Sequence, residues 1–507
     1  MTIDSGRRMI GVLLIVMSAS ALYFRVSLTY FCGYDDFMET RRADLVDRVN
    51  PRSVYTTTHF DSFKYRPLNR AATLVTYLTH PGDALPFRLR NLAFHELAGV
   101  EVYALALILF ESWPAACLAG LLFVLHPLAN QSVDAAVWTN TTANALFLGS
   151  LLLFLLGMRR RNLRLLLLAS LCSAIDVLLY EAAIMLPVLM SVWWAIDCLA
   201  NKRWPRFREP AVFVFANCSL FGTYLLFRQH IVHGARVGVT PPLSILKGLA
   251  EDAGALLLPF DLVLANTWFH TPLPSELRAN GIGKIALIAA AVIIALLVFA
   301  LFKYRKALAA CATEVGWPNF LLLTSAMALS ILPLVLFSEH VSETYLYLPL
   351  AFFCILLGRL LTLIPSVPAR CITVVLVLFM FCCATWVRNE RVRTCGVEAA
   401  LILSTLAAAP FHQGTWQIDV AKTPGTITPL HFGLYNYRGL DTLGSGDPGL
   451  GEFGLRGVEA AVQMKARNPR LSVTVHSAVD LRTVCAHPAP NQACFWVAPS
   501  GTVAPFR

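Results

Sequence analysis

Long apolar runs alternate with short polar segments along most of the chain. Many of these runs approach 20 residues, the length at which an α-helix crosses the hydrocarbon core of a bilayer. The pattern predicts an all-α polytopic membrane protein with about eleven transmembrane helices. We place them near residues 10–30, 91–110, 113–129, 137–157, 163–181, 183–200, 210–228, 284–302, 317–337, 345–364 and 371–387.

The first run contains "SASA", which resembles the small-residue cleavage site of a signal peptide. The apolar sequence continues beyond it through Phe24. This continuation favours an uncleaved first helix over a removed signal peptide.

Basic clusters decide the predicted orientation. They all fall on one side of the membrane if about eleven helices cross, and the positive-inside rule makes that side the cytoplasm. The N-terminus is then cytoplasmic and the C-terminus lies outside. "RNERVR" (388–393) falls on the outer side and argues mildly against this orientation. The clusters are Arg7 with Arg8, "RRRNLR" (159–164), "NKRWPRFR" (201–208) and "KYRK" (303–306).

Two long segments, about 31–90 and 229–283, are predicted as outer loops of a transmembrane domain that covers residues 1–387. "PLNRAATLVTYL" (67–78) has the apolar spacing and the initial proline of a helix that lies in the membrane interface. The charged run 243–265 reads as a juxtamembrane or re-entrant piece on the outer face.

Residues 388–507 have ordinary polarity and read as a small extracytoplasmic α/β domain. "LRGVEAAVQMKAR" has helical spacing, and "LSVTVHS" and "CFWVA" are strand-like. Cys485 and Cys494 flank a turn-rich loop and are placed to close a hairpin disulfide if this end is extracytoplasmic.

Composition supports the membrane class and excludes two others. Charged residues make up 14% of the 507, where a soluble chain carries roughly a quarter. The net charge of +10 does not indicate nucleic-acid binding, because the basic residues lie mostly in short loops between apolar runs. No cysteine or histidine spacing is that of a zinc site, so we expect no metal.

Two adjacent carboxylates, Asp35 and Asp36, follow the first helix in "CGYDDFME". Taken alone, the pair is typical of a polar helix end. The alternative is a general base at the membrane surface, with a pKa tuned by the neighbouring carboxylate and by partial burial.

Further polar residues near the outer ends of the predicted helices are candidates for substrate binding. Arg66 and Arg70 suit either anionic lipid headgroups or a phosphate. Asn91 and His95 share one helix face close to hydrocarbon, where polar groups often mark functional sites. The remaining candidates, each with helix capping or a helix boundary as the alternative role, are His126, Gln131, Glu181, Glu343 and Tyr345.

These pieces together resemble the GT-C superfamily of integral-membrane glycosyltransferases. They are most similar to the branch that holds the protein O-mannosyltransferases and the transmembrane-and-tetratricopeptide-repeat mannosyltransferases, as a bacterial relative without the repeats. The resemblance spans roughly residues 20–395. It is carried by "YDDFMETRRA", "KYRPLNRAATLVTYL" with "RLRNLAFHEL", "GLLFVLHPLANQSVDAAVW" and "SETYLYLPLAFF", with "YEAAIMLP" and "TWVRNERV" as weaker support.

The resemblance implies a function and a place. A mannose-like hexose moves, with inversion, from a polyprenyl-phosphate donor to a hydroxyl of a protein or envelope glycan on the outer face of a bacterial inner membrane. Asp35 is the implied base, with Asp36 as neighbour or substitute, and no cofactor is needed. Residues 388–507 are the expected contact for an envelope protein partner.

The sequence departs from the family pattern at several polar positions. Gln131 stands where relatives have an acid, Tyr180 where they have a lysine, and Thr344 where they have an arginine. A catalytically silent scaffold in an envelope-glycan complex is therefore the alternative function. A transporter is disfavoured because the polar groups gather toward one face and no matched broken helices are visible.

Overall fold

The computed structural model describes residues 5–31, 34–57, 65–201, 208–231, 316–337, 343–408, 413–422, 453–476, 478–497 and 503–506, with a few single positions besides. The predicted helix near 284–302 and the run 243–265 lie outside these residues, as does nearly all of the second outer loop. The side chains of Asp35 and Glu343 also lie outside them, although both residues belong to described helices.

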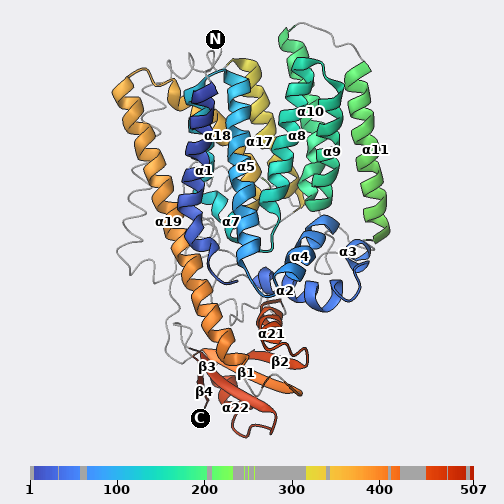
Figure 1. The fold of residues 1–507 in the computed structure, drawn as a ribbon, viewed down its shortest axis with the longest axis vertical. Helices are drawn as coiled ribbons and strands as arrows, with labels where there is room; N and C mark the ends of the chain where they lie inside the picture. Colours follow the sequence, from blue (N-terminus) through green and yellow to red (C-terminus); the bar gives the residue numbers. More distant parts are fainter. Residues whose placement is uncertain are drawn as a thin grey trace.

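The other ten predicted helices each have a counterpart among the described residues. They pack side by side in one bundle (Figure 1). Their bounds are α1 (Ser5–Ser27), α5 (Leu85–Phe110), α6 (Trp113–Leu125), α8 (Asn140–Arg160), α9 (Leu163–Leu179), α10 (Leu186–Asn201), α11 (Arg208–Ile231), α17 (Trp317–Phe337), α18 (Glu343–Thr362) and α19 (Val367–Leu406).

Six of the described helices are long and apolar enough to cross a membrane. A seventh span results if α6 is counted with the short helices after it, a 3₁₀ turn (η2, Pro127–Ala129) and α7 (Asn130–Asp134). This pair bends by 51° at the break. His126 and Pro127 stand at the break, where proline cannot continue the hydrogen-bond ladder. The larger total of eleven crossings stays a prediction.

Basic residues of two predicted cytoplasmic clusters lie at the same end of the bundle. Trp113 Nε1 donates to the carbonyl of Arg7, 2.6 Å away, and Arg159 Nη2 donates to the carbonyl of Ile108, 2.9 Å away. Trp113 and Ile108 flank the short turn between α5 and α6. This shared end is what the positive-inside rule requires of the predicted orientation.

Four short helices of the first predicted outer loop gather at the opposite end of the bundle, next to the C-terminal sheet (Figure 1). Proline opens α4, as expected, because its missing N–H costs nothing in the first helical turn. The four are α2 (Tyr34–Arg42), a π-helical turn η1 (Ala43–Asp47), α3 (Ser53–Thr56) and α4 (Pro67–Thr79).

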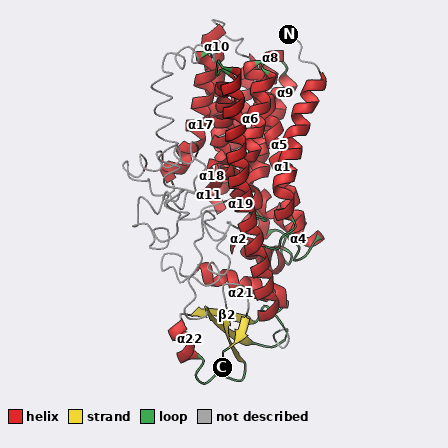
Figure 2. Cartoon of the chain, turned by 90° about the vertical axis from the view of Figure 1, so that its left-hand side faces the viewer, coloured by secondary structure: helices red, strands yellow, loops and turns green. Residues whose placement is uncertain are grey.

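The helix α19 does not end where its apolar run ends. It is 40 residues long and runs from the bundle to the C-terminal unit (Figures 1 and 2). The predicted domain boundary at 387/388 therefore falls inside one helix, and the first strand begins only at Trp416.

The C-terminal unit is a small α/β sheet, as predicted. Its strand order is β2-β1-β3-β4, in which β1 pairs in parallel with β2 and β3, and β4 is antiparallel. The predicted disulfide between Cys485 and Cys494 is present. The bounds are β1 (Trp416–Lys422), α21 (Phe453–Ala466), β2 (Leu471–His476), α22 (Ala478–Val484), β3 (Gln492–Val497) and β4 (Val503–Pro505).

One hydrophobic cluster joins this sheet to the loop helices. Phe37 of α2, Leu74 of α4 and Val137 lie in it with Val462 of α21 and Val473 of β2. Burial of a side chain of this kind contributes about 1.5–3 kcal/mol. The sheet is therefore packed onto the end of the bundle that carries Asp35 and Asp36.

Candidate functional site

The acidic pair lies in the first turn of α2, at the loop end of the bundle. The side chain of Asp36 is 1% exposed, and its Oδ1 accepts a hydrogen bond from the backbone N–H of Val137 over 3.1 Å. A hydrogen bond to a buried carboxylate is worth more than a neutral one. Asp36 thus ties α2 to the segment that follows α7.

That segment, residues 134–138, is held from α5 by three side chains of "RLRN". Arg88 Nη1 donates to the carbonyl of residue 134, and Arg90 Nη2 donates to those of residues 136 and 138 over 3.1 and 3.0 Å. Asn91 Nδ2 donates to the carbonyl of residue 135 over 2.6 Å. Asn91, a predicted substrate ligand, is engaged here in fixing the segment that receives Asp36.

Arg66 stands at the N-terminus of α4, against the first turn after α9. Its Nη2 and Nε lie 2.7 and 2.8 Å from Glu181 Oε2, and its guanidinium carbon lies 4.5 Å from the ring centre of Tyr180. Burial lowers the pKa of the Arg66 guanidinium, but the Glu181 carboxylate, Tyr180 and Tyr345 together raise it, so this pKa lies above its usual range. Two residues 115 positions apart in sequence form a fixed ion pair over an aromatic face.

Several buried polar atoms of α4, α5, the start of α8 and the turn after α9 have no hydrogen-bond partner among the described residues. A buried polar group without a partner costs about 1–3 kcal/mol, so a group of them signals a place where water or a ligand supplies the partners. The atoms are Asn69 Oδ1, Thr73 Oγ1, Arg90 Nη1, Thr141 Oγ1, Thr142 Oγ1, Tyr180 Oη and Glu181 Oε1.

A small apolar cluster shows that α4, the start of α8 and the turn after α9 meet; these elements bear all of the atoms except Arg90 Nη1. Ala143 and Tyr180 pack together in it, with Leu68 of α4 and Tyr345 of α18 against them. The cluster therefore joins the start of α8, the turn after α9 and the first turn of α4. It also brings Tyr345, a predicted site residue, next to Tyr180.

The predicted histidines and Gln131 lie deeper in the bundle. His95 Nδ1 is 2.7 Å from the hydroxyl of Tyr347, and its Nε2 is 3.3 Å from the carbonyl of Val124. His126 Nδ1 accepts from the backbone N–H of Leu128 over 3.2 Å and so caps the turn after the helix break. Gln131 is fully buried in α7. These contacts join bundle elements to one another.

Residues of "TWVRNERV" hold the bent pair in place from α19. Arg388 Nη1 donates to the carbonyl of Pro127 over 2.6 Å, and Asn389 Oδ1 accepts a hydrogen bond from Asn130 Nδ2. Asn130 in turn donates to Asp134 Oδ2 over 2.7 Å. The sequence signal for this network is a set of polar residues inside an otherwise apolar helix.

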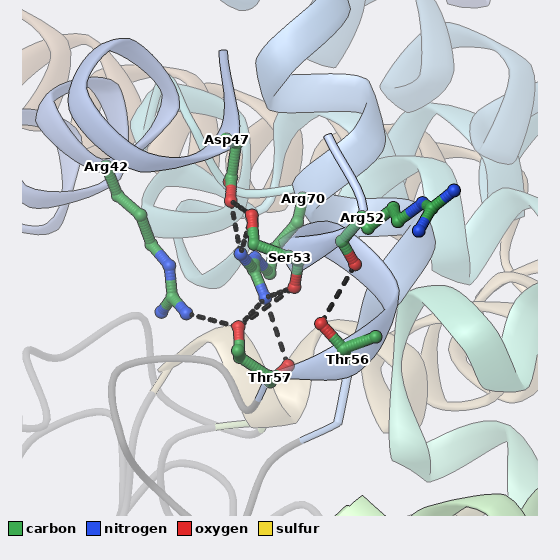
Figure 3. A network of polar contacts seen from close by, with 7 residues as sticks. All are labelled: Arg42, Asp47, Arg52, Ser53, Thr56, Thr57 and Arg70. Carbon is green, nitrogen blue, oxygen red and sulfur yellow. Dashed lines mark hydrogen bonds and ion pairs between the residues drawn. The ribbon is translucent and has the colours of Figure 1, made fainter. Parts of the chain in front are cut away.

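Arg70, also a predicted phosphate ligand, lies in a network of polar contacts with residues of the loop between α2 and α4 (Figure 3). Its guanidinium pairs with Asp47, and Nη1 donates to the carbonyls of Ser53 and Thr57 over 2.7 and 3.0 Å. Arg42 donates to Thr57 Oγ1 from the other side, over 2.9 Å. The network closes the loop between α2 and α4 on itself.

Replacing Arg70 by Ala is expected to loosen this loop strongly. The change leaves the Asp47 carboxylate buried without its cation, a defect that costs about 3–5 kcal/mol. Hydrogen exchange of residues 43–57 in detergent should accelerate accordingly. Arg52→Ala is the matched control, because the Arg52 side chain is exposed in the same loop. Equal exchange in both variants would contradict the role given to the network.

One group of described residues has the spacing of a metal site, namely Asp419 with Cys485 and Cys494. The two cysteines are joined in the disulfide, so they offer no thiolate ligands. The side-chain chemistry of this group therefore does not fit a metal in the oxidised protein.

Comparison with family models finds no match, and no curated protein sequence matches either. Solved structures similar to this chain include an oligosaccharyltransferase of Archaeoglobus fulgidus in complex with Zn and sulfate, at 13% identity and a TM-score of 0.48. That match covers 81% of this chain and 60% of the archaeal one, so this chain spans about three fifths of the length of that protein.

ArnT from Cupriavidus metallidurans, bound to undecaprenyl phosphate, is similar at 13% identity and a TM-score of 0.46, over 96% of this chain and 92% of ArnT. The archaeal oligosaccharyltransferase AglB, in complex with an inhibitory peptide and a dolichol-phosphate, matches at 12% identity and a TM-score of 0.46, over 81% and 62%. All three TM-scores lie below 0.5.

Proposed function

We propose that the protein is a membrane glycosyltransferase that moves a mannose-like hexose from a polyprenyl-phosphate donor to a hydroxyl acceptor. The reaction takes place at the end of the bundle that carries α2 and α4, which is the outer face in the predicted orientation. The proposal rests on the resemblance to the mannosyltransferase branch of the GT-C superfamily and on the contacts of Arg66.

The position of Arg66, stacked on Tyr180 and paired with Glu181, is the observation that carries the proposal. A departing phosphate needs a cation, and a guanidinium binds phosphate oxygens in a two-pronged fashion. The family pattern has a lysine where this chain has Tyr180, and the Arg66 guanidinium lies directly over the Tyr180 ring. Arg66 thus supplies from α4 the positive charge that position 180 lacks. Glu181 neutralises this charge while no phosphate is bound.

Asp35 is the proposed general base. Its partner in the pair, Asp36, already accepts the N–H of Val137 and ties α2 to residues 134–138. With Asp36 in this structural role, we assign the deprotonation of the acceptor hydroxyl to Asp35. The hydroxyl then attacks the anomeric carbon as the lipid phosphate leaves.

The buried polar atoms that have no partner among the described residues are the proposed hydrogen-bonding groups for the sugar. A hexose presents several hydroxyls that each donate and accept, and Thr141, Thr142 and Asn69 offer uncharged groups of the same kind. Binding of a hexose would satisfy atoms that otherwise destabilise the site.

Transfer is tested with membranes that contain the wild-type chain and a polyprenyl-phosphate donor carrying radiolabelled mannose. Label is expected to move from the lipid fraction to a protein or glycan fraction. A wild-type chain that leaves all the label on the lipid would favour the alternative, a silent scaffold in an envelope-glycan complex.

A further inference from the structure

A buried amide joins the helix that carries Asp35 and Asp36 to the C-terminal sheet. Arg41 Nε of α2 donates to Gln463 Oε1 of α21 over 2.7 Å. The other end of the same amide, Gln463 Nε2, donates to the carbonyl of Leu471 in β2 over 2.6 Å. Gln463 is 4% exposed, so its bond to Leu471 is shielded from water, whereas the bond to the half-buried Arg41 is partly shielded.

We call the hydrogen bonds that link Arg41, Gln463 and Leu471 the Gln463 joint. Residues on both sides of it belong to one hydrophobic cluster. Phe37, one residue after Asp36, packs in the same cluster as Val462, the neighbour of Gln463. Val137, whose N–H bonds to Asp36, belongs to this cluster as well. Displacement of α21 would therefore move both partners of the Asp36 contact.

The segment that leads into α2 is held by the same unit. A Cβ on Gly396 of α19 would lie 2.9 Å from the carbonyl oxygen of Tyr30, so the two backbones approach as closely as a glycine allows. The ammonium of Lys465 lies 5.4 Å from the centre of the Tyr30 ring. Arg41 near the end of α2 and Tyr30, four residues before its start, thus have contacts with α21 and α19.

We propose that Gln463 is a positioning residue for sugar transfer, through which the C-terminal unit fixes α2 and the acidic pair relative to residues 134–138. This inference rests on the proposed function, in which α2 carries the base. It gives the C-terminal unit a role in catalysis that requires no contact with the substrate.

A variant pair tests the bond to Arg41. Gln463 Nε2 also donates to Glu459 Oε1 over 2.9 Å. Gln463→Leu and Gln463→Glu both lose the donor to Leu471 and Glu459, but only glutamate keeps an oxygen that accepts from Arg41. The leucine variant is expected to lower kcat by roughly 10- to 100-fold, since a displacement of about 1 Å has effects of that size. Its KM for the donor should stay unchanged, because Arg66 lies outside the joint.

Gln463→Glu should restore part of the lost kcat, because its carboxylate accepts from Arg41 but also faces the Glu459 carboxylate. Arg482→Leu on the exposed face of α22 is the control and should behave as wild type. A purely structural role would instead lower the amount of folded protein in both Gln463 variants, with kcat per folded molecule unchanged. That outcome would overturn the proposal.

Hydrogen exchange of residues 34–42 provides a readout that does not depend on transfer. In Gln463→Leu these amides are expected to exchange about tenfold faster than in wild type and in Gln463→Glu. If these amides exchange faster in Gln463→Leu but the wild type transfers no sugar, the structural role of Gln463 is supported and the proposed function is refuted. Unchanged exchange in Gln463→Leu would refute the joint whether or not the wild type transfers sugar.

Discussion

Asp35→Asn is expected to lower the rate of sugar transfer by roughly 10²- to 10⁴-fold, the range that a positioned general base contributes. Asparagine has nearly the same size but cannot take the proton of the acceptor hydroxyl. Donor binding should be unchanged, because the Arg66 contact is intact. The measurement is the initial rate of label transfer in membranes that contain equal amounts of each variant.

Asp36→Asn is the matched comparison for that experiment. Asparagine keeps a carbonyl oxygen that can accept from the N–H of Val137, so α2 stays tied to its neighbour and the loss of rate should be much smaller. Asp36→Ala removes this acceptor and should fall between the two. If Asp36→Asn is inactive while Asp35→Asn transfers sugar, the two roles must be exchanged.

Arg66→Ala is expected to weaken binding of the donor by roughly 10- to 150-fold, because a hydrogen bond to a charged group contributes about 1.5–3 kcal/mol. Arg66→Lys keeps the charge but loses the planar fork and the stacking on Tyr180, so it should recover only part of the affinity. Arg66→Ala also leaves the Glu181 carboxylate, whose Oε1 is buried, without its cation, so some loss of stability is expected and binding is compared per folded molecule.

Two lipids separate phosphate recognition from general damage to the site. Binding of undecaprenyl phosphate should fall in Arg66→Ala, whereas the weaker binding of undecaprenol should not change. Equal losses for both lipids would show that Arg66 shapes the site without holding the phosphate.

The helical part of the fold was predictable because each long helix corresponds to a separate apolar segment of the sequence. The sequence 67–78 also indicated its helix correctly, since proline and the apolar spacing are local signals. The continuation of α19 beyond residue 387 was not predictable in the same way. Arg388 and Asn389 look like the polar end of a span, but they bond to the helix break at 127–130 rather than to water.

The candidate site was predictable in its residue types but not in its pairings. Arg66 and Glu181 were both identified, yet nothing local in the sequence brings residues 115 positions apart into contact. Asn91 and His95 were chosen because polar groups near hydrocarbon often mark a site. In the structure Asn91 hydrogen-bonds to a backbone carbonyl and His95 to a tyrosine hydroxyl. Both side chains therefore make tertiary contacts between elements of the bundle.

Part of the C-terminal sheet escaped prediction although its signal was present. The strand β1 alternates polar Gln417 and Asp419 with apolar Ile418 and Val420, which is the period-two pattern of a half-buried strand. Its neighbours β2 and β3 were identified from the same pattern. The contact between Arg41 and Gln463 could not be predicted from the sequence, because it depends on how the C-terminal sheet packs on α2.

The central claim is that this chain breaks the sugar–phosphate bond of a polyprenyl-phosphate hexose with an acceptor hydroxyl. Phosphorus NMR of purified protein in nanodiscs, with the donor and an acceptor-containing membrane extract, follows that bond directly. The wild type should convert the phosphodiester signal of the donor into the phosphomonoester signal of free polyprenyl phosphate, and Asp35→Asn should not. A phosphodiester signal that persists unchanged with active, folded wild-type protein would contradict the account.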